Sequence, residues 1–352
     1  MKNRIYSMDF IRAIATVFIF TFHFDMGSPE SPLRIYSTNI FFHNIDMGSM
    51  GVTLFFILSG CGLMYSQRNR QFSLKGYYIN RFWAIFPPFW VAYAFCRLLF
   101  ETFIPHLFQS VPKRYYFFTL IGMDSFLSYK LPNFAMIGEW FLGCIIIIYI
   151  VYPLLRISMI KWPYPTLLFS FLLHEALRFY YPFEISPLWN PLVRLVEFVF
   201  GMFFAQLILD KSKCLSQKQS AIISAFCFIF LCFLFFSDYS SLNIWVMDVI
   251  LISGIILFLF LFEVGKLFSF TPIKKAVNYI SHYSFSIFLV HHPVEMLFAA
   301  YFRTQTLSTP HLICVFTYYV LLIILLGTFL QKVTDKIVKN LKNLGSRKAN
   351  TI

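Results

Sequence analysis

Long runs of apolar residues, separated by short polar segments, follow one another along nearly the whole chain. A helix that crosses a membrane needs about 20 predominantly apolar residues, and lipid admits only helices and closed barrels as spanning structures. Runs of this length predict an all-α, multi-pass transmembrane helical bundle of about ten spans. The ten predicted spans are 8–27, 48–66, 82–101, 137–156, 164–182, 193–209, 219–237, 243–262, 281–301 and 311–331.

The distribution of lysine and arginine predicts the orientation of these spans. With the N-terminus in the cytoplasm, twenty of the 29 basic residues fall in segments on the inner side or in the C-terminal tail. Cytoplasmic segments of membrane proteins carry this excess, so we expect both termini to be cytoplasmic. We divide the chain into a membrane domain, 1–335, and a basic cytoplasmic tail, 336–352. A bacterial cytoplasmic membrane is the expected location.

The composition excludes several classes of protein. Hydrophobic residues make up 59% of the chain and charged residues only 13%, about half of the share in a soluble domain. The net charge of +13 is explained by the topology, since inner basic segments lie against anionic lipid headgroups. We therefore expect membrane lipid as a partner, and no nucleic acid. The seven cysteines lack the spacing of a metal site, so no metal is expected.

The first span carries two ionisable residues, Arg12 and His23. Ionisable side chains are rare within membrane spans and usually mark a functional site or pathway. Eleven residues correspond to about three helical turns, so the two side chains share a face and lie roughly 16 Å apart along the axis. Asp9 and Thr16 fall on the same face. The helix therefore carries a polar stripe from an anion-binding arginine near the inner surface to an imidazole in the outer third.

Other polar residues fall at the same two depths. Arg81 enters its span from the inside. Glu139 begins its span from the outside, and His291 lies about halfway along its span and is grouped with the outer residues. Each has an alternative interpretation: Arg81 as an interfacial anchor, Glu139 as part of an interfacial belt, His291 as part of a proline-kinked packing element. Arg12 has the alternative of reaching the inner headgroups or pairing with Asp9. His23 has the alternative of a hydrogen bond between helices, which is a common role of a lone membrane histidine.

Five segments appear in an order that resembles the integral-membrane acyltransferase 3 family. An arginine, ten residues and then a histidine, as in Arg12 to His23, resembles the family's opening motif. The match is to the stand-alone O-acyltransferase type, without the C-terminal hydrolase-like domain of many relatives. The chain departs from the family at Asn80 and Ala84, where arginines are frequent. The matching segments are 8–23, 51–60, 80–88, 138–142 and 281–293.

The resemblance implies transfer of an acyl group, with acetyl expected, from cytoplasmic acyl-CoA to a hydroxyl of an extracytoplasmic glycan or lipid-linked saccharide. Acyl-CoA is then a donor substrate, and no permanently bound cofactor is expected. His23 takes the role of the catalytic histidine, and Arg12 and Arg81 that of contacts to the donor. Arg68 and Arg70 lie in the inner loop that precedes Arg81. They are assigned to the donor phosphates in place of the arginines that are missing at Asn80 and Ala84.

Three further assignments complete the predicted site. Glu139 lies at a depth similar to that of His23, and a carboxylate there orients the imidazole and stabilises its protonated form, as the third group of a triad does. His291 and Trp140 are assigned to substrate binding. Direct transfer and a transient acyl-histidine both agree with these residues.

Rival classes predict different features. A transporter or flippase of lipid-linked saccharides also has many spans and intramembrane charges, but it needs no acyl donor. A glycan polymerase favours a large outer catalytic loop, whereas the outer loops here are modest. A membrane scaffold leaves the placement of Arg12, His23 and Glu139 unexplained.

Overall fold

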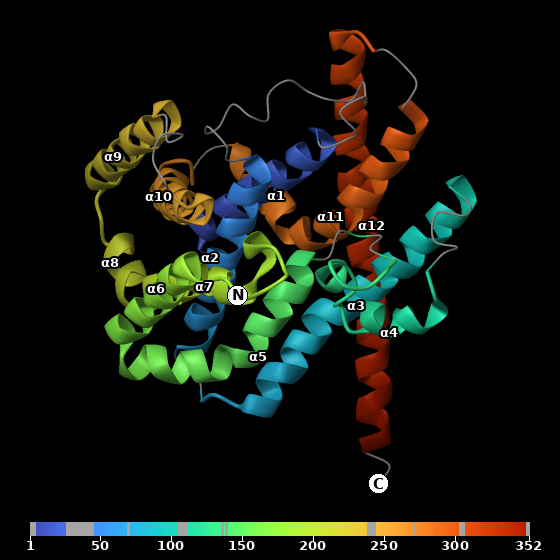
Figure 1. The fold of residues 1–352 in the computed structure, drawn as a ribbon, viewed down its shortest axis with the longest axis horizontal. Helices are drawn as coiled ribbons and strands as arrows, with labels where there is room; N and C mark the ends of the chain where they lie inside the picture. Colours follow the sequence, from blue (N-terminus) through green and yellow to red (C-terminus); the bar gives the residue numbers. More distant parts are fainter. Residues whose placement is uncertain are drawn as a thin grey trace. The chain divides into compact units, whose positions relative to one another are not determined.

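Figure 1 shows a computed structural model of the chain, in which helices are the regular secondary structure throughout the described residues. The structure describes residues 5–25, 46–68, 71–104, 111–134, 137, 140–237, 244–269, 272–302 and 307–349. The α-helices are α1 (Tyr6–Asp25), α2 (Met47–Gln67), α3 (Leu74–Phe103), α4 (Tyr116–Leu120), α5 (Trp140–Lys161), α6 (Pro163–Phe179), α7 (Pro191–Phe203), α8 (Leu209–Lys213), α9 (Gln217–Phe236), α10 (Val246–Leu267), α11 (Ile273–Phe302) and α12 (Thr309–Ala349).

Shorter helical segments connect some of these elements. Three are 3₁₀ turns: η2 (Lys113–Tyr115), η3 (Ser125–Leu127) and η4 (Pro187–Trp189). The fourth, η5 (Phe204–Ile208), is a π-helical turn that joins α7 to α8 without a break. A π turn bonds each N–H to the carbonyl five residues earlier, and it commonly interrupts an α-helix at a functional position.

The predicted multi-pass helical membrane bundle is confirmed. Among the described residues, nine helices are long and apolar enough to cross a membrane, and each overlaps a predicted span. The remaining predicted span, 164–182, corresponds to α6, which has 17 residues. At 1.5 Å per residue α6 is about 25 Å long, somewhat shorter than the ~30 Å hydrocarbon core.

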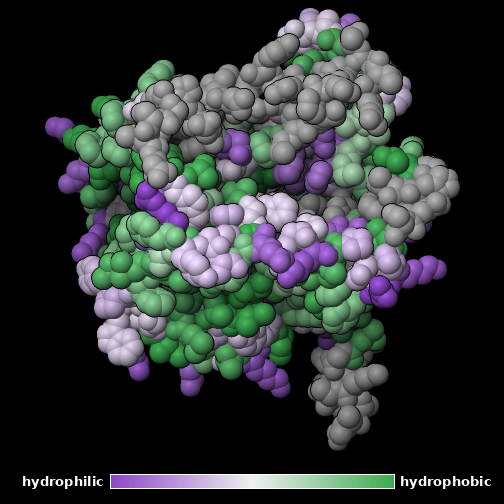
Figure 2. All heavy atoms as spheres, viewed as in Figure 1, coloured by the Kyte–Doolittle hydropathy of each residue, from purple (hydrophilic) through white to green (hydrophobic). Residues whose placement is uncertain are grey.

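Large apolar side chains cover the outside of these helices. Leu154 on α5 and Phe226 on α9 expose 71% and 70% of their surface, and Figure 2 shows apolar side chains over much of the visible face. Such extended apolar surface is unfavourable in water. It faces lipid in a protein that lies in a membrane.

The chain forms two compact units. The first unit contains α1, α2, α5 to α10 and the beginning of α11, up to His282. The second unit contains α3, α4, the rest of α11 and α12. Neither unit corresponds to the predicted division at residue 335, and α12 continues through that position as one helix of 41 residues. The division into a membrane domain and a cytoplasmic tail stays a prediction.

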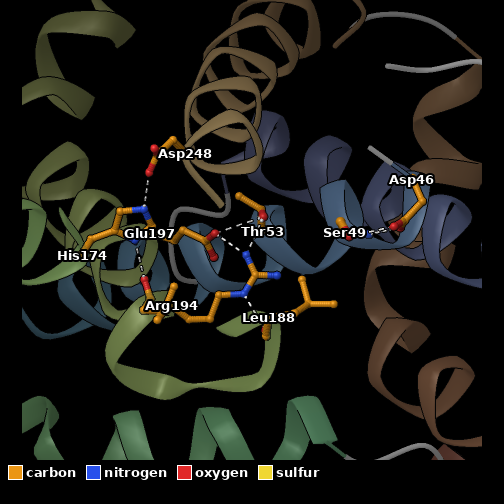
Figure 3. Close-up of polar contacts among 9 residues, drawn as sticks. Asp46, Ser49, Thr53, His174, Leu188, Arg194, Glu197 and Asp248 are labelled. Atoms are coloured by element: carbon orange, nitrogen blue, oxygen red, sulfur yellow. Dashed lines mark hydrogen bonds and ion pairs between the residues drawn. The ribbon is translucent and has the colours of Figure 1, made fainter. Parts of the chain in front are cut away.

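Helix α2 lies at the centre of the first unit, where it contacts α1, α5, α7 and α10. Asp46 caps its N-terminus and accepts a hydrogen bond from the Ser49 N–H at 2.6 Å (Figure 3). Phe22 of α1 lies against Gly48 near this end, and Met8 lies near Gly62 towards the other end. The two helices are therefore antiparallel.

Helices α2 and α7 run in the same direction and touch backbone to backbone. A Cβ atom at Gly60 would lie 1.9 Å from the carbonyl oxygen of Phe198. A Cβ atom at Gly201 would lie 2.0 Å from the carbonyl oxygen of Ile57. No side chain fits at either glycine without moving a main-chain segment. Close approach through small residues is a common way to associate helices in a membrane, where packing replaces the hydrophobic driving force.

This contact leads to a stability prediction. We expect Gly60→Ala and Gly201→Ala to destabilise the protein by about 1–3 kcal/mol each, because the new methyl group overpacks the contact. The thermal unfolding midpoint of the purified protein in detergent measures the effect. Gly62→Ala is the matched control on α2, since the nearest atom to its methyl group is 4.0 Å away. A midpoint for Gly60→Ala equal to that of Gly62→Ala contradicts the prediction.

Candidate functional site

Arg12 is held by a hydrogen-bonded cluster near the beginning of α1. Its Nη1 donates to Asp9 Oδ1 and to Ser281 Oγ, both at 3.3 Å, while Ser281 Oγ donates to Asp9 Oδ1 at 2.6 Å. Asp9 and Ser281 are buried, whereas 32% of the Arg12 side chain is exposed. The alternative pairing of Arg12 with Asp9 is thus present, and Ser281 of α11 joins it. An oriented, accessible guanidinium is well suited to bind phosphate or carboxylate.

His23 lies at the other end of the same helix. Because α1 is continuous from Tyr6 to Asp25, Arg12 and His23 share a face and lie roughly 16 Å apart, as predicted. His23 is partly exposed, and the ring of Phe22 meets it edge to face at 5.4 Å. Between them, the Thr16 hydroxyl donates to the Arg12 carbonyl at 2.8 Å. The Thr16 hydroxyl therefore bonds within its own helix, and a functional role of the polar stripe stays a prediction.

Arg68 directly follows α2 and belongs to an ion cluster that the sequence did not predict. Its Nη1 contacts Asp210 Oδ2 at 2.7 Å, and Lys213 contacts Asp210 Oδ1 at 3.3 Å. The Arg68 guanidinium and the Lys213 ammonium both lie over the ring of Tyr65, at 4.4 and 4.6 Å from its centroid. The predicted donor contact Arg68 therefore belongs to a partly exposed group of two cations and one carboxylate. Arg70 lies outside the described residues.

A second ion cluster, inside the first unit, joins α8 to α10. Ser212 Oγ donates to Glu263 Oε1 at 2.7 Å, and Lys266 pairs with Glu263 and donates to the Ser212 carbonyl at 3.0 Å. Glu263 is buried, so its charge is matched by the lysine and the hydroxyl. This cluster binds α8 to the same end of the unit as Arg68.

Trp140 is the first residue of α5 and stacks on Trp189. The two ring centroids are 5.8 Å apart and the planes differ by 14°. Sequence reasoning assigned Trp140 to substrate binding without identifying Trp189. Glu139, the predicted partner of His23, lies outside the described residues.

Two predicted site residues belong to the second unit. Arg81 is partly exposed near the beginning of α3. His291 is buried in α11, where its Nδ1 donates to the Phe288 carbonyl at 2.5 Å and its own carbonyl accepts from Tyr319 OH at 3.3 Å. His292 and Glu295, one turn apart, approach each other at 3.6 Å. The packing interpretation of His291 agrees with these bonds, and its assignment to substrate binding stays a prediction.

Arg194 and Glu197 form a buried ion pair that sequence reasoning missed (Figure 3). The side chain of Arg194 is 0% exposed and that of Glu197 is 2% exposed. Arg194 Nη1 donates to Glu197 Oε1 at 2.5 Å and to Thr53 Oγ1 at 3.2 Å, and its Nε donates to the Leu188 carbonyl at 3.0 Å. The i,i+3 spacing of opposite charges within an apolar run was the available signal.

One donor and one acceptor of this pair are unused. Arg194 Nη2 and Glu197 Oε2 are buried without a hydrogen-bond partner among the described residues. Buried polar atoms of this kind usually bind an ordered water or a ligand group. A hydroxyl or a water suits such atoms, because each both donates and accepts hydrogen bonds.

A second polar network crosses from α6 to α10. His174 Nδ1 donates to the Val193 carbonyl and Nε2 contacts Asp248 Oδ1, each at 3.1 Å (Figure 3). Arg178 contacts the other oxygen of Asp248 at 2.9 Å and Glu175 at 3.6 Å. His174, Glu175 and Asp248 have the proximity of metal ligands, but Arg178 already supplies positive charge to both carboxylates. We interpret the group as an ion-pair network between helices.

The sequence places this architecture among known proteins. Residues 5–328 match the model of an acyltransferase domain. The chain belongs to the acyltransferase 3 family. No curated protein and no solved structure matches the chain.

The match confirms the resemblance drawn from the five motifs, all of which lie inside the matched range. This acyltransferase 3 protein is therefore a multi-pass membrane acyltransferase. The buried clusters of its first unit include residues of α2 and α10, and these two helices pack against α1, on which the predicted catalytic histidine and its arginine partner lie.

The buried ion pair yields a prediction of its own. We expect Arg194→Met to destabilise this acyltransferase by about 3–5 kcal/mol, because Glu197 is left charged and buried with the Thr53 hydroxyl but without a positively charged partner. The double variant Arg194→Met with Glu197→Gln removes the isolated charge and should recover much of the loss. Thermal unfolding in detergent compares the two. A double variant no more stable than Arg194→Met contradicts this explanation.

Proposed function

We propose that the protein is a membrane O-acyltransferase that moves an acyl group, with acetyl expected, from cytoplasmic acyl-CoA to a hydroxyl of an extracytoplasmic glycan or lipid-linked saccharide. The observation that carries this proposal is the continuity of α1. One helix holds an oriented arginine near one end and a partly exposed histidine near the other, roughly 16 Å away.

The donor side of the proposal rests on charge. CoA carries several phosphate charges and does not cross lipid, so its nucleotide portion stays at the basic cytoplasmic side. Asp9 and Ser281 orient Arg12, and its partly exposed guanidinium binds such an anion in this scheme. Arg81, together with Arg68 and Arg70, provides further positive charge for the phosphates. The flexible pantetheine arm then carries the thioester along α1 towards His23.

The acceptor side rests on proton transfer. His23 in its neutral form accepts the proton of the acceptor hydroxyl, which is the general-base role that histidine most often takes in enzymes. The hydroxyl oxygen bonds to the thioester carbonyl carbon, the carbon–sulfur bond breaks, and the thiolate of CoA takes the proton from the imidazolium. Glu139 stabilises the imidazolium in this scheme, and His291 and Trp140 bind the acceptor. An acyl-histidine intermediate is the alternative route with the same products.

The role of His23 is tested by substitution. We expect His23→Ala to lower turnover by a factor of about 100 to 10,000, the range of general base catalysis. Purified protein in vesicles, supplied with acetyl-CoA and a glycan acceptor, is assayed for free CoA thiol and for the mass of the glycan. Glu139→Gln should give a smaller loss.

His311→Ala is the matched control. His311 is exposed at the beginning of α12, where its Nδ1 contacts Ser308 Oγ at 2.7 Å, and it has no role in the proposed site. We expect this variant to keep its activity. Near-normal turnover of folded His23→Ala removes the proposed base.

The cluster around Arg12 predicts a separate effect on the donor. Ser281→Ala removes one of the groups that orient Arg12 but leaves its charge, so we expect a KM for acetyl-CoA raised several-fold and a smaller change in kcat. Arg12→Ala should raise the same KM further. Steady-state kinetics at varied acetyl-CoA measures both variants. An unchanged KM in both excludes Arg12 from donor binding.

A further inference from the structure

Trp140 and Trp189 form an aromatic pair from two separate segments of the chain. Trp140 begins α5 and Trp189 ends η4. Their nearly parallel planes, 14° apart, and the centroid distance of 5.8 Å describe an offset stack. Both residues are partly exposed. The pair therefore presents indole surface to the surroundings while each ring fixes the other.

The segment that carries Trp189 is anchored by a buried arginine. Arg194 Nε donates to the carbonyl oxygen of Leu188, the residue next to Trp189, at 3.0 Å (Figure 3). Glu197 and Thr53 hold the same guanidinium from α7 and α2. Arg194 thus connects the core of the first unit to the backbone beside Trp189.

A second set of bonds fixes the same segment from its other side. Asn190 caps α7 by accepting from the Leu192 N–H at 2.9 Å, and its Nδ2 donates to Tyr181 OH at 3.0 Å. Tyr181 OH in turn donates to the Ile185 carbonyl at 2.6 Å. A short connection between two helices is therefore fixed at three points. Binding sites are held in this way, because their side chains must keep one position before the ligand arrives.

The pair lies at the His23 end of the first unit. Phe22 of α1 lies against Gly48 near the beginning of α2, and Thr53, a little further along α2, bonds to Arg194. Trp189 precedes Arg194 and lies towards this same end of α7. The Arg12 cluster lies at the opposite end of α1.

We propose that Trp140 and Trp189 form the surface on which a sugar ring of the acceptor lies, and that Arg194 is a positioning residue for Trp189. The inference rests on the proposed function and names the recognition element for its acceptor. One face of a pyranose ring is lined by C–H groups, which carry partial positive charge and pack on the negative face of an indole. Rigid aromatic rings lose little conformational entropy on binding.

The rival explanation is an interfacial tryptophan belt, which anchors a protein in the membrane without binding an acceptor. Trp162 allows the two to be separated. It lies directly after the other end of α5, is 59% exposed, and has Lys161 over its ring at 5.8 Å. Trp162→Ala is therefore the matched control for loss of an exposed tryptophan near α5.

The kinetic experiment uses the full-length protein in vesicles, acetyl-CoA as donor, and the oligosaccharide pool released from the envelope of the host cell as acceptor. We expect Trp189→Ala and Trp140→Ala to raise the apparent KM for the pool about tenfold, the effect of losing one stacking contact. The KM for acetyl-CoA should not change. Trp162→Ala should match the wild type in both constants.

The positioning role of Arg194 needs its own variant. Arg194→Lys keeps a positive charge beside Glu197 but has no Nε hydrogen to bind the Leu188 carbonyl. We expect the KM for the pool to rise as in Trp189→Ala, and the near-ultraviolet circular dichroism of the stacked indoles to weaken. A purely structural role of Arg194 lowers the melting temperature and leaves that KM at the wild-type value.

The outcomes separate this inference from the proposed function. If the wild type transfers acetyl groups while Trp189→Ala behaves like Trp162→Ala, the sugar-binding surface is wrong and the proposed function stands. If the wild type transfers no acetyl groups, the proposed function fails. The sugar-binding surface is then tested by tryptophan fluorescence during titration with the same oligosaccharide pool, in a detergent without a sugar headgroup. Quenching that disappears in Trp189→Ala supports the surface, and absence of quenching in the wild type overturns it.

Discussion

The direct contact between the backbones of α2 and α7 is the constraint on which the first unit depends. Only glycine at positions 60 and 201 allows the two helices to come this close. The same approach brings Thr53 within 3.2 Å of Arg194 and so allows a guanidinium to be buried in the interior. Lipid provides no water to solvate such a charge. Packing and charge compensation therefore depend on each other here.

Charged side chains of the first unit gather at the two ends of its helices. Towards the beginning of α1 lie three groups that combine basic residues with a carboxylate, and two of them include a serine hydroxyl. Towards the His23 end lie the buried pair of α7 and the network between α6 and α10. Each group contains an ion pair. The charged residues therefore join the helices, and no single charge of these groups is buried without a partner of opposite sign.

Much of this arrangement was accessible from the sequence, and the reason differs from element to element. Helical spans follow from the length of apolar runs, and the shared face of Arg12 and His23 follows from helical periodicity alone. The pairing of Arg68 with Asp210 was not accessible, because it depends on how distant helices pack. The i,i+3 spacing of Arg194 and Glu197 indicates that they share a helix face, but the burial of this pair depends on how α2 packs against α7.

Trp189 shows the same limit in another form. It lies between Pro187 and Pro191, outside the predicted spans, and nothing in the local pattern indicates that Trp140 stacks on it. Stacking depends on three-dimensional proximity, which composition and periodicity do not encode. Glu139 and Arg70 stay predictions because they lie outside the described residues.

The π-helical turn between α7 and α8 has a consequence for how the sequence can vary. A π turn holds one residue more than an α turn, and each residue in a helix corresponds to a rotation of about 100°. Ser212 faces α10 while Asp210 faces Arg68, so both orientations depend on that additional residue. Deleting one residue from Phe204–Ile208 rotates the following turn and disengages both contacts together. Evolution is therefore freer to exchange side chains in this segment than to change its length.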